Sequence, residues 1–79
     1  MSETYCYIFI KGTAGFVEDI VLRLREMEEV EEANVVTGTI DVIAKIKGKD
    51  MQTITKNILS EIHRIDGVER TSTHFVVPL

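Results

Sequence analysis

Apolar residues recur along this chain in two sets with the same helical spacing, and Ile54, which begins the second set, stands 38 positions after Phe16, which begins the first. In both sets the apolar positions follow one another at steps of four, one, three, three and three residues. Positions spaced in this way lie on one face of a helix, so the pattern predicts amphipathic helices over residues 14–28 and 51–65. The sets are Phe16, Ile20, Val21, Leu24, Met27 and Val30, and Ile54, Ile58, Leu59, Ile62, Ile65 and Val68.

Four other segments are rich in β-branched and aromatic residues and predict strands, at residues 5–10, 32–37, 40–46 and 69–77. The resulting order is β-α-β-β-α-β. Two βαβ halves joined by a hairpin are typical of the α+β ferredoxin-like split fold, a four-stranded antiparallel sheet with two helices on one face. At 79 residues we expect one domain, residues 1–79.

Alternation along the strands predicts which side chains face the helices. Ile40, Val42, Ala44 and Ile46 form an apolar row on the helix side, and a two-residue turn at Gly38 and Thr39 would place Ala33 and Val35 beside them. Asp41, Ile43 and Lys45 then point to the other face.

The first predicted strand places aromatic residues on the face that no helix covers. Cys6, Ile8 and Ile10 are expected on the helix side, which leaves Tyr5, Tyr7 and Phe9 on the open face. A large exposed apolar patch usually marks an association surface. We therefore expect a homo-oligomer, at least a dimer, whose interface includes Tyr5, Tyr7, Phe9 and Ile43.

Charge and composition exclude several classes of function. With 13 acidic against 9 basic residues the net charge is −4, which argues against binding nucleic acid unaided. Neither a long apolar run nor a leader is visible, so we expect no membrane span, and the lone Cys6 suits a reducing cytoplasm. His63 and His74 lack the spacing of a metal or catalytic site, and we expect no cofactor and no enzymatic activity.

Asp41 is the residue whose position calls for a chemical explanation. A carboxylate just past a glycine-centred turn lies near backbone N–H groups that the turn leaves unpaired, which together complement a zwitterion. In the competing interpretation, Asp41 caps the hairpin or pairs with Lys45 across the open face.

The segment "VVTGTIDVIAKI" resembles the hairpin of the effector domain of the Lrp/AsnC family, the RAM domain, whose strands frame a G-x-x-D turn, here Gly38, Thr39, Ile40 and Asp41. The resemblance extends from "YIFIKGTAGFVEDIVLRLREMEEVEEA" through "GVERTSTHFVV". Family members typically carry an N-terminal helix-turn-helix, whereas this chain starts at the first strand. It resembles a stand-alone effector domain.

The resemblance implies a small-molecule sensor that regulates transcription. In the family, dimers form through their sheet faces, assemble further into octameric rings, and bind amino-acid effectors between dimers near the turn. Gly38 and Asp41 match the turn, and Thr71 and Thr73 match threonines of the final strand, although alternation puts these two on the helix side. Thr39 and Ile40 occupy variable positions that would tune the accepted side chain, and a full-length Lrp/AsnC regulator is the implied partner.

Two alternatives remain open from the residues. One is a ligand-free oligomerisation module, which differs from a sensor only in lacking an effector. The other is a small dimeric α+β barrel enzyme, in which His74 on the open face beside Tyr5 or Tyr7 would serve as acid or base.

Overall fold

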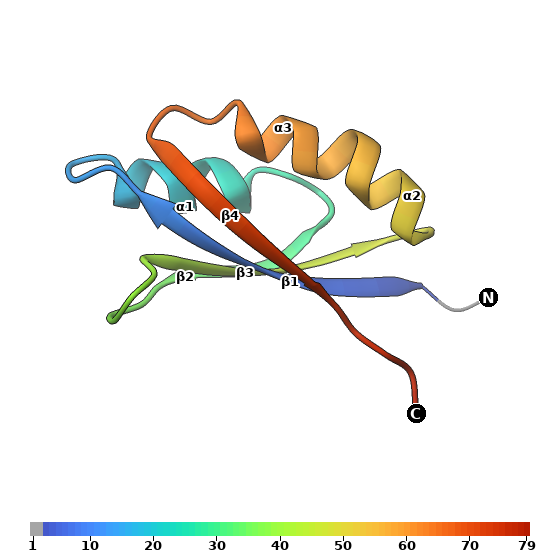
Figure 1. The fold of residues 1–79 in the computed structure, drawn as a ribbon. Coiled ribbons are helices and arrows are strands. Elements are labelled where there is room, and N and C mark those ends of the chain that lie inside the picture. Colours follow the sequence, from blue (N-terminus) through green and yellow to red (C-terminus); the bar gives the residue numbers. More distant parts are fainter. Residues whose placement is uncertain (1–2) are drawn as a thin grey trace.

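A computed structural model describes residues 3–79 as a four-stranded sheet with its helices on one side (Figure 1). The strands are β1 Thr4–Gly12, β2 Val30–Val35, β3 Val42–Gly48 and β4 Val68–Phe75. The helical elements are α1 Val17–Arg25, then α2 Met51–Thr53, the π-helical turn η1 Ile54–Ile58 and α3 Leu59–His63. The sheet order is β2-β3-β1-β4 with every neighbouring pair antiparallel, which confirms the predicted ferredoxin-like βαββαβ topology.

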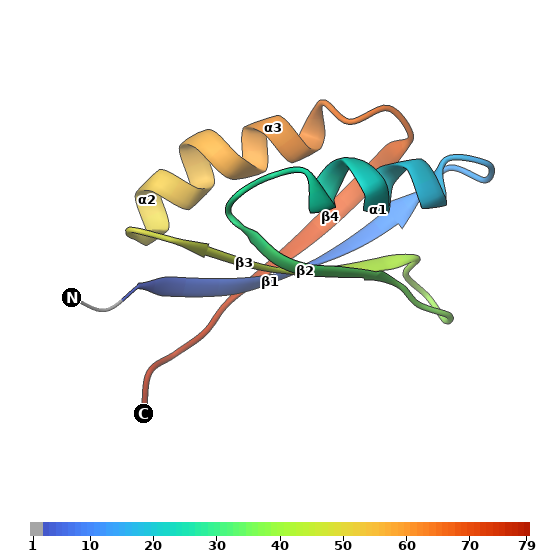
Figure 2. The ribbon, with the colours of Figure 1, turned by 180° about the vertical axis from the view of Figure 1, so that it is seen from behind.

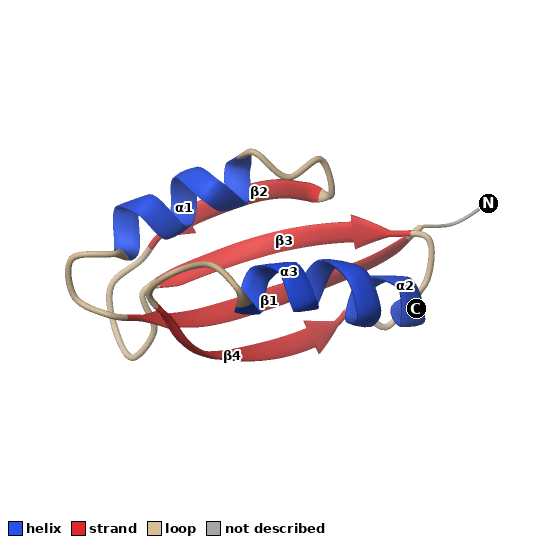
Figure 3. Cartoon of the chain, turned by 90° about the horizontal axis from the view of Figure 1, so that it is seen from above, coloured by secondary structure: helices blue, strands red, loops and turns tan. Residues whose placement is uncertain are grey.

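The core lies between the sheet and the helices, which cover the same face of the sheet in the views from behind and from above (Figures 2 and 3). Ile40, which was expected to begin the inward row, precedes β3 and is only half-buried. For the residues within β1 and β3 the predicted helix side is confirmed, because all the expected inward residues are fully buried. They are Cys6, Ile8, Ile10, Val42, Ala44 and Ile46. The helices contribute Ile20, Val21, Leu24, Ile54, Ile58, Leu59, Ile62 and Ile65 to the same cluster. Within residues 3–79, no helix is both long enough and apolar enough to cross a membrane.

The pairing of β2 with β3 follows the predicted register, but the predicted turn is wrong. Val35 pairs with Val42 and Ala33 with Ala44, the pairs that a two-residue turn at Gly38 would impose. Regular pairing stops at Val35 and Val42, however, and residues 36–41 form a loop. Val35 is consequently exposed, because it lies at the end of β2 beyond the cover that α1 gives to Ala33.

Strand β1 is longer than predicted, and its extension brings further residues to the end of the sheet. It continues past Ile10 to Gly12, where its register with β4 shifts. An added Cβ on Gly12 would lie 3.0 Å from Ile20 and 3.4 Å from Val17, so α1 packs closely over the glycine backbone. The absent side chain lets the strand and the helix approach each other.

The second helical segment begins at a side-chain cap and contains a wide turn. Asp50 accepts a hydrogen bond from the N–H of Thr53 at 2.7 Å, which satisfies a donor at the start of α2. In η1 the N–H of Leu59 bonds to the carbonyl of Ile54, five residues earlier. Ile54 packs directly over Gly48, where an added Cβ would lie only 2.5 Å from its side chain.

The turn from α3 into β4 depends on Gly67 and on Phe16. Phe16 was predicted within the buried stripe, but it precedes α1, is 40% exposed and covers Gly67 instead. Gly67 has a φ of +94°, and its carbonyl accepts a hydrogen bond from the N–H of Thr13 at 2.8 Å. The β1–α1 and α3–β4 connections are therefore joined by a hydrogen bond to Gly67, which has no side chain.

Gly15, before α1, and Gly67, before β4, allow the cost of backbone strain to be measured apart from the cost of steric contact. Gly15 and Gly67 have nearly equal φ values, +93° and +94°, but an added Cβ would meet nothing within 4 Å at Gly15 and would lie 2.3 Å from Phe16 Cβ at Gly67. We expect Gly15→Ala to lower the free energy of unfolding by about 1–2 kcal/mol. Gly67→Ala should lower it by about 1–3 kcal/mol more, because an overpacked contact is added. Urea titration of both variants checks this, and equal losses would contradict the role of Phe16.

Candidate functional site

The loop between β2 and β3, residues 36–41, contains the G-x-x-D sequence and is fixed at its base by backbone hydrogen bonds. The N–H of Val36 donates to the carbonyl of Asp41 at 2.9 Å, and the N–H of Asp41 donates to the carbonyl of Ile10 in β1 at 2.9 Å. Beyond this base the loop projects from the end of the sheet (Figure 1). Gly38 has a φ of +118°, which a residue with a side chain rarely adopts.

The Asp41 carboxylate is held by the end of β1. Its Oδ2 accepts the N–H of Gly12 at 2.9 Å and lies 3.3 Å from Lys11 Nζ, and its side chain is 25% exposed. The hydrogen bond from Gly12 lowers the pKa of Asp41 most; partial desolvation raises it by less, and Lys11 lowers it further, so that the pKa lies below its ordinary value. The site therefore presents an ionised carboxylate in a fixed position.

The loop also contains backbone donors that have no hydrogen-bond partner among the described residues. Within the described residues 3–79, none of the N–H groups of residues 37–40 donates a hydrogen bond to another residue. Oδ1 of Asp41 also has no hydrogen-bond or ion-pair partner in that range, since both contacts are made by Oδ2. The loop thus combines a free acceptor with free donors, the groups that an ammonium and a carboxylate require.

The sequence alternative in which Asp41 pairs with Lys45 is wrong. Lys45 Nζ lies 3.7 Å from Glu31 Oε1 and 5.0 Å from the centre of the Tyr5 ring. The cross-strand neighbour of Lys45 in β1 is Tyr7, whereas Asp41 precedes Val42, which pairs with Ile10. Asp41 therefore binds the end of β1, and Lys45 pairs with an acid of β2.

Thr71 and Thr73 lie on the helix side of β4, as alternation predicted. They pair with Ile10 and Ile8, whose side chains are buried beneath the helices. Thr71 Oγ1 is 2.8 Å from Nε2 of His63, at the end of α3. No hydrogen bond within residues 3–79 joins either threonine to residues 38–41, and strand β1 separates them from β3. One chain therefore does not bring the two halves of the predicted site into contact.

The open face carries the residues predicted for the dimer interface. Tyr5, Tyr7 and Phe9 of β1 alternate with buried residues, and Phe9 pairs with Ile43 of β3. Tyr7 is 39% exposed, and no helix lies on this side of the sheet (Figures 1 and 2). A β-bulge between Val30 and Glu32 sets the acids of β2 against Lys45. The face is an aromatic strip beside a row of ion pairs.

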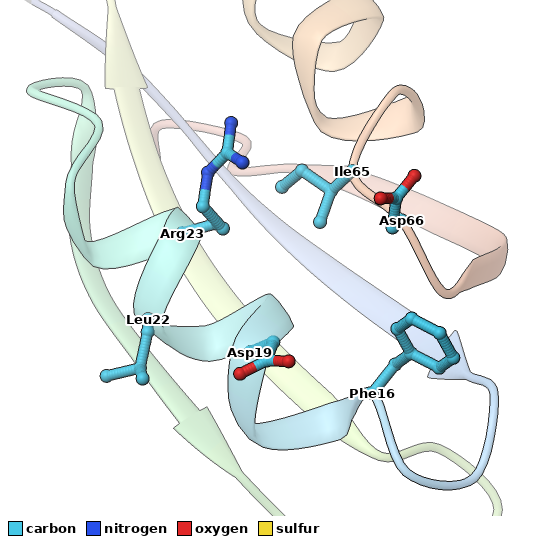
Figure 4. Close-up of a pocket in the computed structure, with 6 residues that line it drawn as sticks. All are labelled: Phe16, Asp19, Leu22, Arg23, Ile65 and Asp66. Atoms are coloured by element: carbon cyan, nitrogen blue, oxygen red, sulfur yellow. The ribbon is translucent and has the colours of Figure 1, made fainter.

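A groove of about 370 Å³ lies on the helix side, between α1 and the turn after α3 (Figure 4). Phe16, Arg23, Ile65 and Asp66 border the gap between the two elements. Asp19 and Leu22 complete its lining. None of the residues of the G-x-x-D loop lines this groove.

Sequence reasoning missed the two residues that hold Asp41, because Lys11 and Gly12 fell outside the predicted first strand. A strand prediction extended to Gly12 would have placed both beside the loop. Cys6 lies in the core, and burial raises the pKa of its thiol. The part of the chain that the structure describes contains no cluster of three or more His, Cys, Asp or Glu side chains suited to a metal ion.

Comparison with known proteins places the whole sheet and both helices within one family. The model of the Lrp/AsnC ligand binding domain matches residues 5–78. Among curated proteins, the HTH-type transcriptional regulator PH0140 of Pyrococcus horikoshii is 30% identical over 71 residues, which cover 90% of this chain and 45% of the relative. The chain thus spans about half the length of the curated relatives it matches.

Solved structures share the fold closely. The hypothetical protein PHS023 from Pyrococcus horikoshii superimposes with a TM-score of 0.87 and 26% identity, over 96% of this chain and 92% of that one. The transcriptional regulator NMB0573 from Neisseria meningitidis, in complex with L-Met, has a TM-score of 0.84 at 21% identity, over 95% of this chain and 50% of that one. At that identity the second likeness shows the fold alone.

The contact between Asp41 and Gly12 predicts how folding stability depends on pH. Because the native pKa of Asp41 lies below its ordinary value of 3.8, the stabilisation is present above about pH 4 and is lost as the pH falls through the native pKa. Asp41→Asn should remove this part of the acid sensitivity, so its unfolding free energy should fall less steeply below pH 4. Chemical denaturation of both proteins between pH 7 and pH 2 measures the difference. Parallel curves would contradict the hydrogen-bonded carboxylate.

Proposed function

This chain belongs to the family of Lrp/AsnC ligand-binding domains, related to transcriptional regulators, and from that premise we propose that it binds an amino acid at Gly38, Thr39, Ile40 and Asp41. Binding would change how the chain assembles with a partner regulator and so modulate transcription. The family is one of transcriptional regulators, which are not enzymes.

The observation that carries the proposal is the pairing of a free carboxylate oxygen with unbonded N–H groups in one loop. Oδ2 of Asp41 is occupied by Gly12 and Lys11, which fixes the carboxylate, while Oδ1 is open to an ammonium group. The N–H groups of residues 37–40 are open to a carboxylate. Charge-assisted hydrogen bonds of both kinds would be made in a site that needs little rearrangement.

Thr71 and Thr73 fit this proposal as groups contributed by a neighbouring copy. Within one chain they lie beyond β1 on the helix side, away from the loop. An effector bound between dimers could meet the loop of one copy and the threonines of another. Thr39 and Ile40, at the tip of the loop, would then contact the effector side chain and set its preferred size. The L-Met bound by NMB0573 makes amino acids the first compounds to test.

Dimerisation through the open face is the second part of the proposal. A second copy is the occupant that fits this face, because its charges are self-complementary: Lys11, Lys45 and Lys47 each lie within 4.0 Å of an acid of the same chain. Two such faces can meet without net repulsion, and the aromatic strip of each would cover the other. Tyr5, Tyr7, Phe9 and Ile43 would leave water on association, which is favourable for apolar surface.

Effector binding is tested by a thermal-shift screen of the twenty amino acids followed by calorimetry on two matched variants. We expect Asp41→Asn to weaken binding roughly ten- to a hundredfold, because a charged hydrogen bond to the ammonium is lost. Asp50→Asn is the control, since Asp50 also accepts a backbone N–H but does so at the start of α2. It should leave affinity unchanged.

Equal affinity of the Asp41 variant and the parent would refute the role of the carboxylate. A chain that responds to none of the amino acids would instead favour the ligand-free oligomerisation module.

The interface is tested by placing a charge on each side of the molecule. Tyr7→Glu should raise the dimer Kd at least roughly a hundredfold, because an unpaired carboxylate would be buried between the sheets. Leu22→Glu is the control, since Leu22 is 57% exposed on α1. It should not affect association. Sedimentation or light scattering across a concentration series distinguishes the two. A monomeric parent at micromolar concentration would refute the interface.

A further inference from the structure

His74 lies on the open face in the edge strand β4, and β1 separates it from β3 and the loop of residues 36–41. It pairs with Tyr7 across β1 and β4, and its ring lies 4.8 Å from the ring of Phe9, at a tilt of 37°. Its Nε2 is 2.8 Å from the hydroxyl of Ser72, two residues earlier in the same strand. A titratable ring is thus packed into the aromatic strip that a second copy would cover.

No acidic side chain faces His74. Within residues 3–79 its polar contact is with the Ser72 hydroxyl, which can donate to a neutral imidazole nitrogen or accept from one, and no carboxylate lies within 4.0 Å of it. The acids of this face lie at its margins: Glu3 before β1, Glu31 and Glu32 in the bulged β2, and Asp41 beside the end of β1. The ionisable groups on this side of the sheet are Glu3 before β1, Tyr5, Tyr7 and Lys11 of β1, Glu31 and Glu32 of β2, Asp41, Lys45 and Lys47 at β3, and Arg70 of β4.

We infer that His74 makes association through the open face dependent on protonation, so that the dimer forms with neutral imidazoles and weakens when they gain a proton. This inference rests on the dimer of the proposed function and adds a regulatory property to it. A histidine ordinarily changes charge between pH 5 and 8, which is the range in which the effect would operate.

Protonation is expected to weaken the dimer because of desolvation and because no acidic side chain faces His74. Burial between two sheets disfavours the charged form of any group, and no carboxylate of the same face is placed to compensate a proton on His74. Because the two copies related by symmetry each contribute one His74, two protons would oppose the formation of one dimer.

The second histidine of the chain provides a matched comparison. His63 also bonds a hydroxyl at 2.8 Å, that of Thr71, but it lies on the helix side of the sheet. Both histidines are exposed in the single chain, and each contacts a hydroxyl of β4. They lie on opposite faces of the sheet, so a comparison of the two tests whether position on the open face causes the pH dependence.

The experiment measures the dimer Kd by sedimentation at pH 8.0, 7.0, 6.0 and 5.5, with the parent, His74→Gln and His63→Gln. For the parent we expect Kd to rise roughly tenfold or more as the pH falls, because each imidazole that gains a proton would have to lose its hydration on association. His63→Gln should behave like the parent. His74→Gln keeps a hydrogen-bonding group beside Ser72 but cannot be protonated, so its Kd should stay constant.

Each other outcome overturns the inference in a distinguishable way. A parent dimer whose Kd is constant over this range leaves the interface intact and removes the proton dependence. If the Kd of His74→Gln depends on pH, the proton binds to another group. If the Kd of His63→Gln is constant, the proton binds on the helix side. A parent that is monomeric at every pH refutes the dimer itself, and the inference falls with the proposed interface. Circular dichroism at each pH confirms that the variants remain folded.

Discussion

One-sided burial is the constraint on which the rest of this structure depends. The chain of 79 residues forms two short helical segments, and both lie on the same face of the sheet. The inward residues of β1 and β3 are fully buried there, while their neighbours on the other face keep partial exposure. The sheet therefore has one face buried in the core and one face available for association. The aromatic strip and the ion pairs lie on the second face.

The loop of residues 36–41 lies at the end of the sheet, where β1 contributes to both faces. Asp41 is joined to Gly12 and Lys11, and Lys11 follows Phe9 by two residues on the same face of β1. The loop is therefore attached to the strand that carries the aromatic strip as well as closed by its own hydrogen bond between Val36 and Asp41. A group bound to Asp41 would act directly on the strand at the centre of the open face.

Periodic features of this fold could be predicted from the sequence, and features that depend on single contacts could not. The alternation of Cys6, Ile8 and Ile10 and the helical stripes determine the layers, because burial repeats with the geometry of each element. The register of β2 with β3 followed from the same alternation. The length of the connecting loop did not, because the unpaired residues 37–40 have no periodic pattern. The hydrogen bond between Gly12 and Asp41 spans 29 positions of sequence and leaves no local signal. The π-helical turn at residues 54–58 likewise could not be predicted, because the apolar residues there have the same spacing as in the first helical set.

The β-bulge in β2 has a consequence for how copies of this chain can add to one another. Strands β2 and β4 form the two edges of the sheet, where backbone groups are free to pair with a strand of another molecule. The bulge interrupts the regular hydrogen-bonding row of β2 and places Glu31 and Glu32 side by side on that edge. Strand β4 carries mostly polar residues between Glu69 and His74. An edge that is twisted by a bulge or rich in polar groups is a poor template for edge-to-edge growth. These edges therefore protect the chain against open-ended fibril-like stacking.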